Sequence, residues 1–362
     1  MNDKTNEPST PTRRSLLTSA AAVGLAAPTG IIAAKVFAAP RPVPLPDFDS
    51  KICKTAATAD SGGPLKKITF AWNAGAPCLL AITVAKDKGF FVKHGLDVDL
   101  INYSGSTDQL LETLATGKAD AAVGMALRWL KPLEQGFDVK IVSSLHGGCM
   151  RVIAPTASGI NGLKDLKGKT IAVSDMNSPA KNFFSILLKK EGLDPNTDVD
   201  FRQFPGPLLR VAVEKGEAHA VADGDPNTFT WQKDGRFREI ASNLDGEYAN
   251  RTCCIIGVRG SLIREDKPTA AAIARALLDA SDYAAHNPAE AAATYTPFAT
   301  SKVELEDLTA LAKYHTHHHH PVGVDLKKEL ALYAEELKLV NIFKPTTDTA
   351  KYAERIYADV LS

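Results

Sequence analysis

A chain of 362 residues, of which 44% are hydrophobic, is long enough to bury two substantial cores. Its 42 basic and 42 acidic side chains cancel, so the net charge supplies no long-range field that would attract nucleic acid or an anionic membrane. We therefore expect no nucleic-acid partner, and any selectivity has to come from local groups.

Residues 1–39 are typical of an export signal rather than of folded structure. Arg13 and Arg14 stand before an alanine-rich apolar run from 16 to about 37, and Ala38 suits a cleavage point. The twin arginines resemble a Tat-type signal, which predicts export to the periplasm in a folded state. A single membrane anchor is the alternative, and the proline, glycine and lysine inside the run disfavour it because a spanning helix needs about 20 apolar residues.

Residues 40–64 contain alternating prolines from Pro40 to Pro46 and end in Gly62-Gly63-Pro64. This composition predicts an extended tether. Folded structure is therefore expected from Leu65 onward.

From Leu65 the sequence alternates between strands and helices. A strand at 68–72 leads through a small-residue loop into a helix that opens at Pro77 and reaches Phe91. The expected elements that follow are a strand from 96, a helix at 110–117, a short strand at 120–124, a helix at 125–136 and a strand at 139–145. The unit of strand, loop and helix is thus repeated several times.

The pattern restarts after a crossover strand at 151–154. The expected elements are then a strand ending at 173, a helix at 180–190, a strand at 199–203, a helix ending at 215, a segment at 218–226 that repeats the earlier Gly-x-Ala-Asp motif, and a return strand at 253–258. Further helices are expected at 268–285 and about 289–296, 304–313, 324–338 and 347–361. This alternation predicts an α/β fold with mostly parallel sheets, which bind ligands at the carboxyl ends of their strands.

Three sequence motifs between residues 88 and 120 resemble those of a known protein family. Lys88-Gly89-Phe90-Phe91 is followed by Gly95-Leu96-Asp97-Val98, and then by the spacing Leu-x-x-Leu-Ala-x-Gly-x-Ala-Asp at 111–120. These motifs resemble the opening of periplasmic substrate-binding proteins of the nitrate/sulfonate/taurine type, which serve ABC importers. The resemblance covers nearly everything after residue 64, and the family's relatives include binders of bicarbonate and of thiamine-pyrimidine precursors.

The resemblance implies a two-lobe α/β periplasmic binding protein fold of type II, with a ligand cleft between the lobes. Residues 65–152 and 256–362 would form the first lobe, and residues 153–255 the second. The implied ligand is a small anionic solute of the nitrate, sulfonate or taurine kind, and the implied partner is an ABC permease in the inner membrane. We expect a monomer, because the lobes must move freely, and a function that requires no cofactor.

Residues at strand-to-helix junctions are the expected solute contacts, because loops that enter helices expose backbone N–H groups at the positive end of the helix dipole. The expected contacts are Asn73, Ser106, Thr107, Met125, Arg128, His146, Asn177, Ser178 and Asp225. For most of these residues an ordinary structural role is the alternative to a solute contact. Serine and threonine cap helices, asparagine forms turns, and Arg128 lies inside its helix, where it either reaches inward or is solvated.

The 5 cysteines are irregularly spaced and predict no disulfide framework. Cys53 lies in the tether. Cys78 and Cys149 belong to loops expected at the cleft, where a bridge or a soft-ligand site is the alternative to small buried core residues. His146 stands close to Cys149 in the sequence, so the two could hold a soft metal, or His146 could be an ordinary loop histidine.

Five of the chain's 9 histidines form one internal run, which consists of His315, His317, His318, His319 and His320. Such a run is able to bind Zn, Ni or Cu through neutral imidazoles. Consecutive residues point in different directions, so a complete metal site needs ligands from elsewhere in the chain. A docking role and a solvated helix end are the alternatives, and the resembling family has no such run as a general feature.

These observations favour a non-enzymatic receptor. The sequence shows no nucleotide-binding loop, nucleophile elbow or metallohydrolase helix, so no catalytic residue is predicted. A periplasmic transition-metal-binding protein that uses the histidine run is the alternative. A thiamine-pyrimidine precursor binder or synthase is a third hypothesis, because such synthases resemble this fold, but of their iron-associated cysteine cluster only Cys253-Cys254 has a counterpart here.

Overall fold

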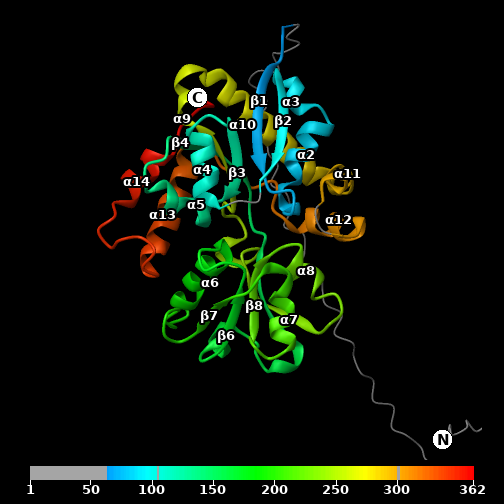
Figure 1. Ribbon diagram of the computed structural model, residues 1–362, viewed down its shortest axis with the longest axis vertical. Coiled ribbons are helices and arrows are strands. Elements are labelled where there is room, and N and C mark those ends of the chain that lie inside the picture. Colours follow the sequence, from blue (N-terminus) through cyan, green and yellow to red (C-terminus); the bar gives the residue numbers. More distant parts are fainter. Residues whose placement is uncertain (1–62, 104–105, 300–301) are drawn as a thin grey trace, which may run out of the picture. The chain divides into compact units, whose positions relative to one another are not determined.

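The computed structural model describes residues 63–103, 106–299 and 302–362. The predicted signal at 1–39, nearly all of the predicted tether at 40–64, and Cys53 lie outside the described residues. Within the described ranges, no helix is both long and apolar enough to cross a membrane. The described elements form two five-stranded sheets with helices packed against them (Figure 1).

The first sheet has the strand order β2-β1-β3-β10-β4. Its strands are β1 (Lys66–Trp72), β2 (Leu96–Asn102), β3 (Ala121–Met125), β4 (Val139–His146) and β10 (Cys254–Arg259). β1 pairs in parallel with β2 and β3, whereas β10 is antiparallel to β3 and β4. Phe70, Ala71 and Trp72 of β1 are all buried, as expected for an inner strand that is covered on both faces.

The second sheet has the strand order β7-β6-β8-β5-β9. Its strands are β5 (Met150–Pro155), β6 (Thr170–Val173), β7 (Asp200–Gln203), β8 (Ala220–Gly224) and β9 (Phe237–Ser242). β6 pairs in parallel with β7 and β8, whereas β5 is antiparallel to β8 and β9. The two sheets therefore repeat one arrangement, in which the strand that crosses over from the other sheet is the antiparallel one.

Most helices accompany the first sheet. They are α2 (Leu80–Asp87), α3 (Phe90–Lys93), α4 (Thr107–Ala115), α5 (Ala126–Leu133), α9 (Gly260–Glu265), α10 (Lys267–His286), α11 (Pro288–Tyr295), α12 (Leu305–Tyr314), α13 (Gly323–Leu339) and α14 (Thr349–Ile356). α10 packs on α2, α3 and β4, and α13 packs on α14, α5 and β4 (Figure 1). The second sheet is accompanied by α6 (Pro179–Lys190), α7 (Leu209–Glu214) and α8 (Asn227–Thr230).

The start and the end of helix α10 are both set by residues that are recognisable in the sequence. The carboxylate of Asp266 accepts a hydrogen bond from the backbone N–H of Thr269 at 3.2 Å, and Pro268 stands in the first turn. Fully buried positions then recur at helical spacing, at Ala270, Ile273, Ala274, Leu277 and Ala280. The helix ends at Asn287, because the following Pro288 disfavours a helical backbone in the residue before it.

The predicted α/β architecture with mostly parallel sheets is confirmed: in each five-stranded sheet a single strand, β10 or β5, runs opposite to the other four. The helix predicted at 347–361 is wrong beyond Ile356. Tyr357 is extended there, and the backbone N–H of Ala358 donates to the carbonyl oxygen of Ile141 in β4 at 2.9 Å. Strand β9 was not predicted at all, since charged and apolar residues do not alternate regularly along it.

The chain passes between the two sheets twice. The first crossover lies between the end of β4 at His146 and the start of β5 at Met150, and the second leads into β10 at Cys254. The lobe boundaries predicted from the resemblance, at 152 and 255, fall within the strands β5 and β10 that follow these crossovers. The His146-Gly147-Gly148-Cys149 segment is therefore a connection between the sheets.

Candidate functional site

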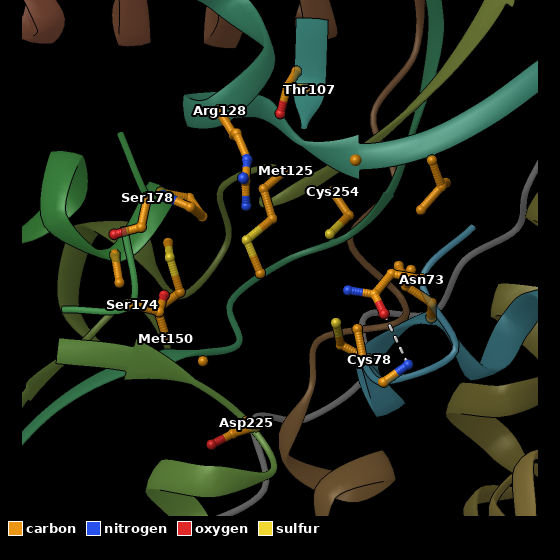
Figure 2. Close-up of a pocket in the computed structure, with 18 of the residues that line it drawn as sticks. Asn73, Cys78, Thr107, Met125, Arg128, Met150, Ser174, Ser178, Asp225 and Cys254 are labelled. Atoms are coloured by element: carbon orange, nitrogen blue, oxygen red, sulfur yellow. Dashed lines mark hydrogen bonds between the residues drawn. The ribbon is translucent and has the colours of Figure 1, made fainter. Parts of the chain in front are cut away.

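A cavity of about 410 Å³ is lined by residues of both sheets and of the loops that follow their strands (Figure 2). It lies at the carboxyl ends of β1, β3, β6 and β8, which is where open α/β sheets bind ligands. The polar lining residues are Asn73, Tyr103, Ser106, Thr107, Arg128, Ser174, Ser178, Asp223, Asp225 and Asn227.

On the side of the first sheet, the cavity meets the N-terminus of α4. The Ser106 hydroxyl accepts a hydrogen bond from the backbone N–H of Gln109 at 3.3 Å, and the Gln109 side chain accepts one from the backbone N–H of Ser106 at 3.1 Å. This reciprocal capping box fixes the start of the helix. Thr107, the first helical residue, also lines the cavity, so the positive end of the α4 dipole borders the cavity.

On the side of the second sheet, the cavity meets the N-terminus of α6. The Ser178 hydroxyl accepts a hydrogen bond from the backbone N–H of Lys181 at 3.2 Å, and Pro179 opens the helix. Ser174, which directly follows β6, lines the cavity beside Ser178 (Figure 2). Two helix N-termini thus border one cavity, an arrangement suited to an anionic group.

Arg128 is the one cation among the described residues that line the cavity. Its guanidinium donates to the carboxylate of Asp175, which follows β6, at 3.1 Å, and both side chains are about one-third exposed. The neighbouring Leu127 carbonyl accepts a hydrogen bond from the buried Asn182 amide of α6 at 3.1 Å. α5 is therefore tied to the second sheet by one ion pair and one buried hydrogen bond.

Two acidic residues at the end of β8, Asp223 and Asp225, lie in different electrostatic environments. Burial raises the pKa of Asp223 to about 6, although its carboxylate accepts a hydrogen bond from the Asn227 amide at 3.2 Å. The carboxylate of Asp225 is fully buried and is contacted by Arg151 at 3.2 Å, Thr228 at 2.9 Å and His315 at 3.0 Å. Asp225 borders the cavity, but its charge is held within this network.

The structure brings most of the predicted contacts together. Those that line the cavity are Asn73, Ser106, Thr107, Met125, Arg128, Ser178 and Asp225. His146 is fully buried outside the lining, and Asn177 is exposed, with its backbone N–H donating to Asp175 at 2.8 Å. Sequence reasoning missed Ser174 and Asp223, although both stand at the ends of strands, which was the available signal.

Ser178 and Asn177 offer a matched pair of substitutions. Ser178→Ala removes a helix cap, so we expect it to lower the free energy of unfolding by about 1 kcal/mol and to weaken solute binding several-fold. Asn177→Ala should leave both unchanged, because that side chain is exposed and outside the lining. Chemical denaturation and calorimetric titration of both variants check this. Equal losses of affinity would return Asn177 to the set of solute contacts.

The histidine run divides between two environments. His315 and His317 are buried beside His146, with ring centroids 5.5 to 6.2 Å apart, and burial lowers the pKa of His317 well below its usual value. His319 instead contacts Glu329 of α13 at 3.1 Å. The expectation that successive histidines point in different directions is confirmed, and metal binding by the run stays a prediction.

The four described cysteines are all free and buried, as the small-core interpretation expected. They are also neighbours: the sulfur atoms of Cys149 and Cys253 are 3.5 Å apart. Cys78 and Cys254 line the cavity.

Comparison with known proteins agrees with this geometry. The family profile described as NMT1/THI5 like matches residues 77–291, more than half of the chain. The chain is 26% identical over 220 residues to the nitrate import ATP-binding protein NrtC of Synechocystis, an alignment that covers 56% of this chain and 32% of that protein. It is 34% identical over 102 residues to the 4-amino-5-hydroxymethyl-2-methylpyrimidine phosphate synthase of Uromyces fabae, covering 28% and 29% of the two chains. The chain thus spans about a third of the length of these relatives.

Several solved structures share the fold. The alkanesulfonate-binding protein SsuA from Xanthomonas axonopodis pv. citri, bound to MOPS, superposes with a TM-score of 0.66 at 18% identity, covering 80% of this chain and 98% of that one. The periplasmic nitrate-binding protein NrtA from Synechocystis gives a TM-score of 0.67 at 14% identity, covering 82% and 87%. The predicted two-lobe periplasmic binding protein fold is therefore confirmed, and at these identities the likeness concerns the fold alone.

Proposed function

Because this chain belongs to the NMT1/THI5-like family, we propose that it is the solute-binding receptor of an ABC importer. In this proposal the two lobes close on a small anionic solute, and the closed protein presents it to a permease in the inner membrane. The observation that carries the proposal is the cavity of about 410 Å³, to which both sheets contribute. A volume of this size suits a small molecule held between two lobes.

The charges around the cavity favour a solute with one anionic group. The N-termini of α4 and α6 and the guanidinium of Arg128 offer positive potential and hydrogen-bond donors. Asp223 stands among the same lining residues, and its ionised form opposes a second negative charge. Nitrate, a sulfonate and an aminosulfonate such as taurine all satisfy these conditions.

The proposal treats the protein as a periplasmic monomer without a catalytic role. Export rests on the twin arginines at 13 and 14, which lie outside the described residues. The hydroxyls, amides and helix N-termini of the lining are groups that bind and orient a solute, and they stand beside Arg128, Asp223 and Asp225. A thiamine-pyrimidine precursor is the second candidate solute, because Trp72 and Tyr103 line the cavity and offer aromatic surface to a planar ring.

Native mass spectrometry of the protein purified from its own periplasm tests the proposal. We expect a single small molecule that is lost on denaturation, and calorimetric titration of the emptied protein with nitrate, alkanesulfonates, taurine, bicarbonate and hydroxymethylpyrimidine to identify it. Ser174→Trp is the control, since an indole at this lining position occupies the cavity and should abolish binding without unfolding the protein. Binding of the pyrimidine alone selects the second candidate, and binding of no solute contradicts the proposal.

Solute affinity should depend on pH through Asp223. Its pKa is raised to about 6, so the group is neutral below that pH and anionic above it. We expect the affinity for an alkanesulfonate, which itself does not titrate, to fall roughly three- to four-fold between pH 5 and 7, because a nearby negative charge costs roughly 1 kcal/mol and most of the titration falls in this range. The raised pKa also means that the folded state holds its proton longer than the unfolded state, so this group's contribution to stability is lost as the pH rises toward 6.

Calorimetry at several pH values with Asp223→Asn as the control checks this expectation. The amide keeps the shape of the side chain and its neighbour Asn227 but cannot ionise. A pH profile that is identical in the wild type and the variant would assign the dependence to another group.

A further inference from the structure

Four thiols and one imidazole converge next to the cavity, which Cys78 and Cys254 line, from segments that are far apart in the sequence. Cys78, Cys149, Cys253, Cys254 and His146 are all at least 96% buried. The sulfur atoms of Cys78 and Cys254 and a ring nitrogen of His146 lie within 4.8 Å of one another. The Cys149 sulfur is 3.5 Å from that of Cys253. The tendency of cysteine to be buried explains why each of these side chains lies in the protein interior. It does not explain why all four described cysteines cluster at one site.

Backbone pairing holds these side chains together. Cys254 is opposite His146 in the antiparallel pairing of β10 with β4, and the backbone N–H of Cys253 donates to the His146 carbonyl at 3.0 Å. The Asn243 amide oxygen accepts hydrogen bonds from the backbone N–H groups of Cys149, at 2.9 Å, and Met150, at 2.7 Å. The donors are therefore positioned by strand register and by a buried side chain, which is the kind of support that a binding site needs.

Gly147 and Gly148, which stand between His146 and Cys149, allow the first crossover to lie close to neighbouring segments. A Cβ atom on Gly148 would lie 2.1 Å from the Asn243 carbonyl oxygen, and one on Gly147 would lie 1.8 Å from the Thr316 hydroxyl. Only glycine allows the first crossover to run this close to its neighbours.

His146 presents one free nitrogen to this cluster. Its Nδ1 donates to the carbonyl oxygen of Gly147 at 2.6 Å, and its Nε2, which is buried, has no hydrogen-bond partner among the described residues. A metal-ligating histidine commonly donates one ring N–H to a carbonyl oxygen and coordinates through the other nitrogen. The ring of His317, 5.5 Å away between centroids, also has two buried nitrogens without a partner in the described residues.

We propose that Cys78, Cys254 and His146 bind one thiophilic d10 metal ion, Zn(II) or Cu(I), with Cys149 or Cys253 as the fourth ligand. Sulfur and imidazole nitrogen are the donors these ions prefer. Donors bound at ~2.0–2.3 Å to a tetrahedral ion lie roughly 3.5 Å apart, so small side-chain rotations close the set. Binding would release the thiol protons of the coordinating cysteines and needs no change of oxidation state.

The position of the cluster also gives the ion a route of entry. Cys78 and Cys254 line the cavity together with Met125 and Met150, and the Met125 side chain lies between Met150 and Cys254 (Figure 2). Soft sulfur ligands thus lead from the cavity to the buried histidine. The metal site does not depend on the proposed anionic solute, because its ligands are neither the helix N-termini nor Arg128.

The test is metal titration of the reduced, metal-free mature chain under anaerobic conditions. Zn(II) and Cu(I) are each added in competition with a chromophoric chelator, and native mass spectrometry counts the ions. We expect one tightly bound ion per chain, and Cys254→Ser and Cys78→Ser to weaken its binding at least 100-fold. Cys53→Ser, which changes a thiol predicted to lie in the tether, is the control and should bind like the wild type. The competition identifies which of the two ions is preferred.

A second variant separates this cluster from the histidine run. Replacing His318, His319 and His320 with alanine should leave the affinity unchanged, and loss of the ion in that variant would move the site to the run and overturn the proposal. X-ray absorption of the metal-loaded wild type decides the case where a cysteine variant fails to fold. A first shell dominated by sulfur supports the proposal, and a shell of nitrogen and oxygen alone, or no stoichiometric ion, refutes it. Solute titrations on the metal-free protein keep the two proposals independent.

Discussion

Replacing Arg151 with methionine is expected to lower the free energy of unfolding by about 3–5 kcal/mol, because it leaves a buried carboxylate without its cation. The side chains of Arg151 and Asp225 are 4% and 0% exposed, and their closest approach is 3.2 Å. Without Arg151, Asp225 keeps only the Thr228 hydroxyl and the His315 imidazole. Methionine is a fair substitute for the stem of arginine, so little of the loss should come from packing.

Arg264→Met is the matched control for this substitution. Arg264 pairs with Asp138 through two contacts of 2.8 Å, as good in geometry as the buried pair, but its side chain is 62% exposed. Exposed ion pairs contribute little to stability, so the midpoint of urea unfolding should hardly move. If Arg151→Met and Arg264→Met behave alike, the buried pair does not stabilise the second sheet. The double variant Arg151→Met with Asp225→Leu should recover much of the loss, since the fully buried carboxylate is then removed as well and the remaining partner of Arg151, Glu239, is 35% exposed.

The alternation of strands and helices could be predicted from the sequence, because it depends on local hydrophobic periodicity and on local helix-ending residues. The α10 boundaries follow from Asp266 at one end and Asn287-Pro288 at the other, all of which can be seen without a structure. What could not be seen was strand direction. β5 and β10 look like any buried strand, and their antiparallel pairing is decided by where the chain crosses between sheets. The extended end after Ile356 likewise depends on a long-range bond to Ile141.

The candidate site was predictable to the extent that it depends on strand ends. Asn73, Ser106 and Ser178 stand at such junctions and line the cavity. His146 also ends a strand, but the register of β4 turns it into the protein, where it meets Cys254. The convergence of the cysteines was not predictable, because their spacing along the chain carries no information about the pairing of β10 with β4. Tertiary register, which no local pattern encodes, makes that cluster.

The second large effect concerns Arg128. Arg128→Gln is expected to weaken binding of an anionic solute by roughly 10- to 100-fold, since a hydrogen bond to a charged group contributes about 1.5–3 kcal/mol. It is the one cation among the described lining residues, and it stands with the N-termini of α4 and α6 around the cavity. Calorimetric titration with the solute identified by mass spectrometry measures the change. The glutamine keeps most of the length of the side chain, so the loss should be confined to charge.

The contribution of Arg128 to anion affinity depends on its ion-pair partner Asp175. Asp175 accepts a hydrogen bond from Arg128 at 3.1 Å and therefore competes with a bound anion for the guanidinium. Asp175→Asn removes that competition, so we expect it to strengthen anion binding a few-fold while Arg128→Gln weakens it. If both substitutions weaken binding equally, the pair acts instead as a latch between α5 and the second sheet, because either change then breaks the same contact. Unchanged affinity in Arg128→Gln would leave the anion to the two helix N-termini alone.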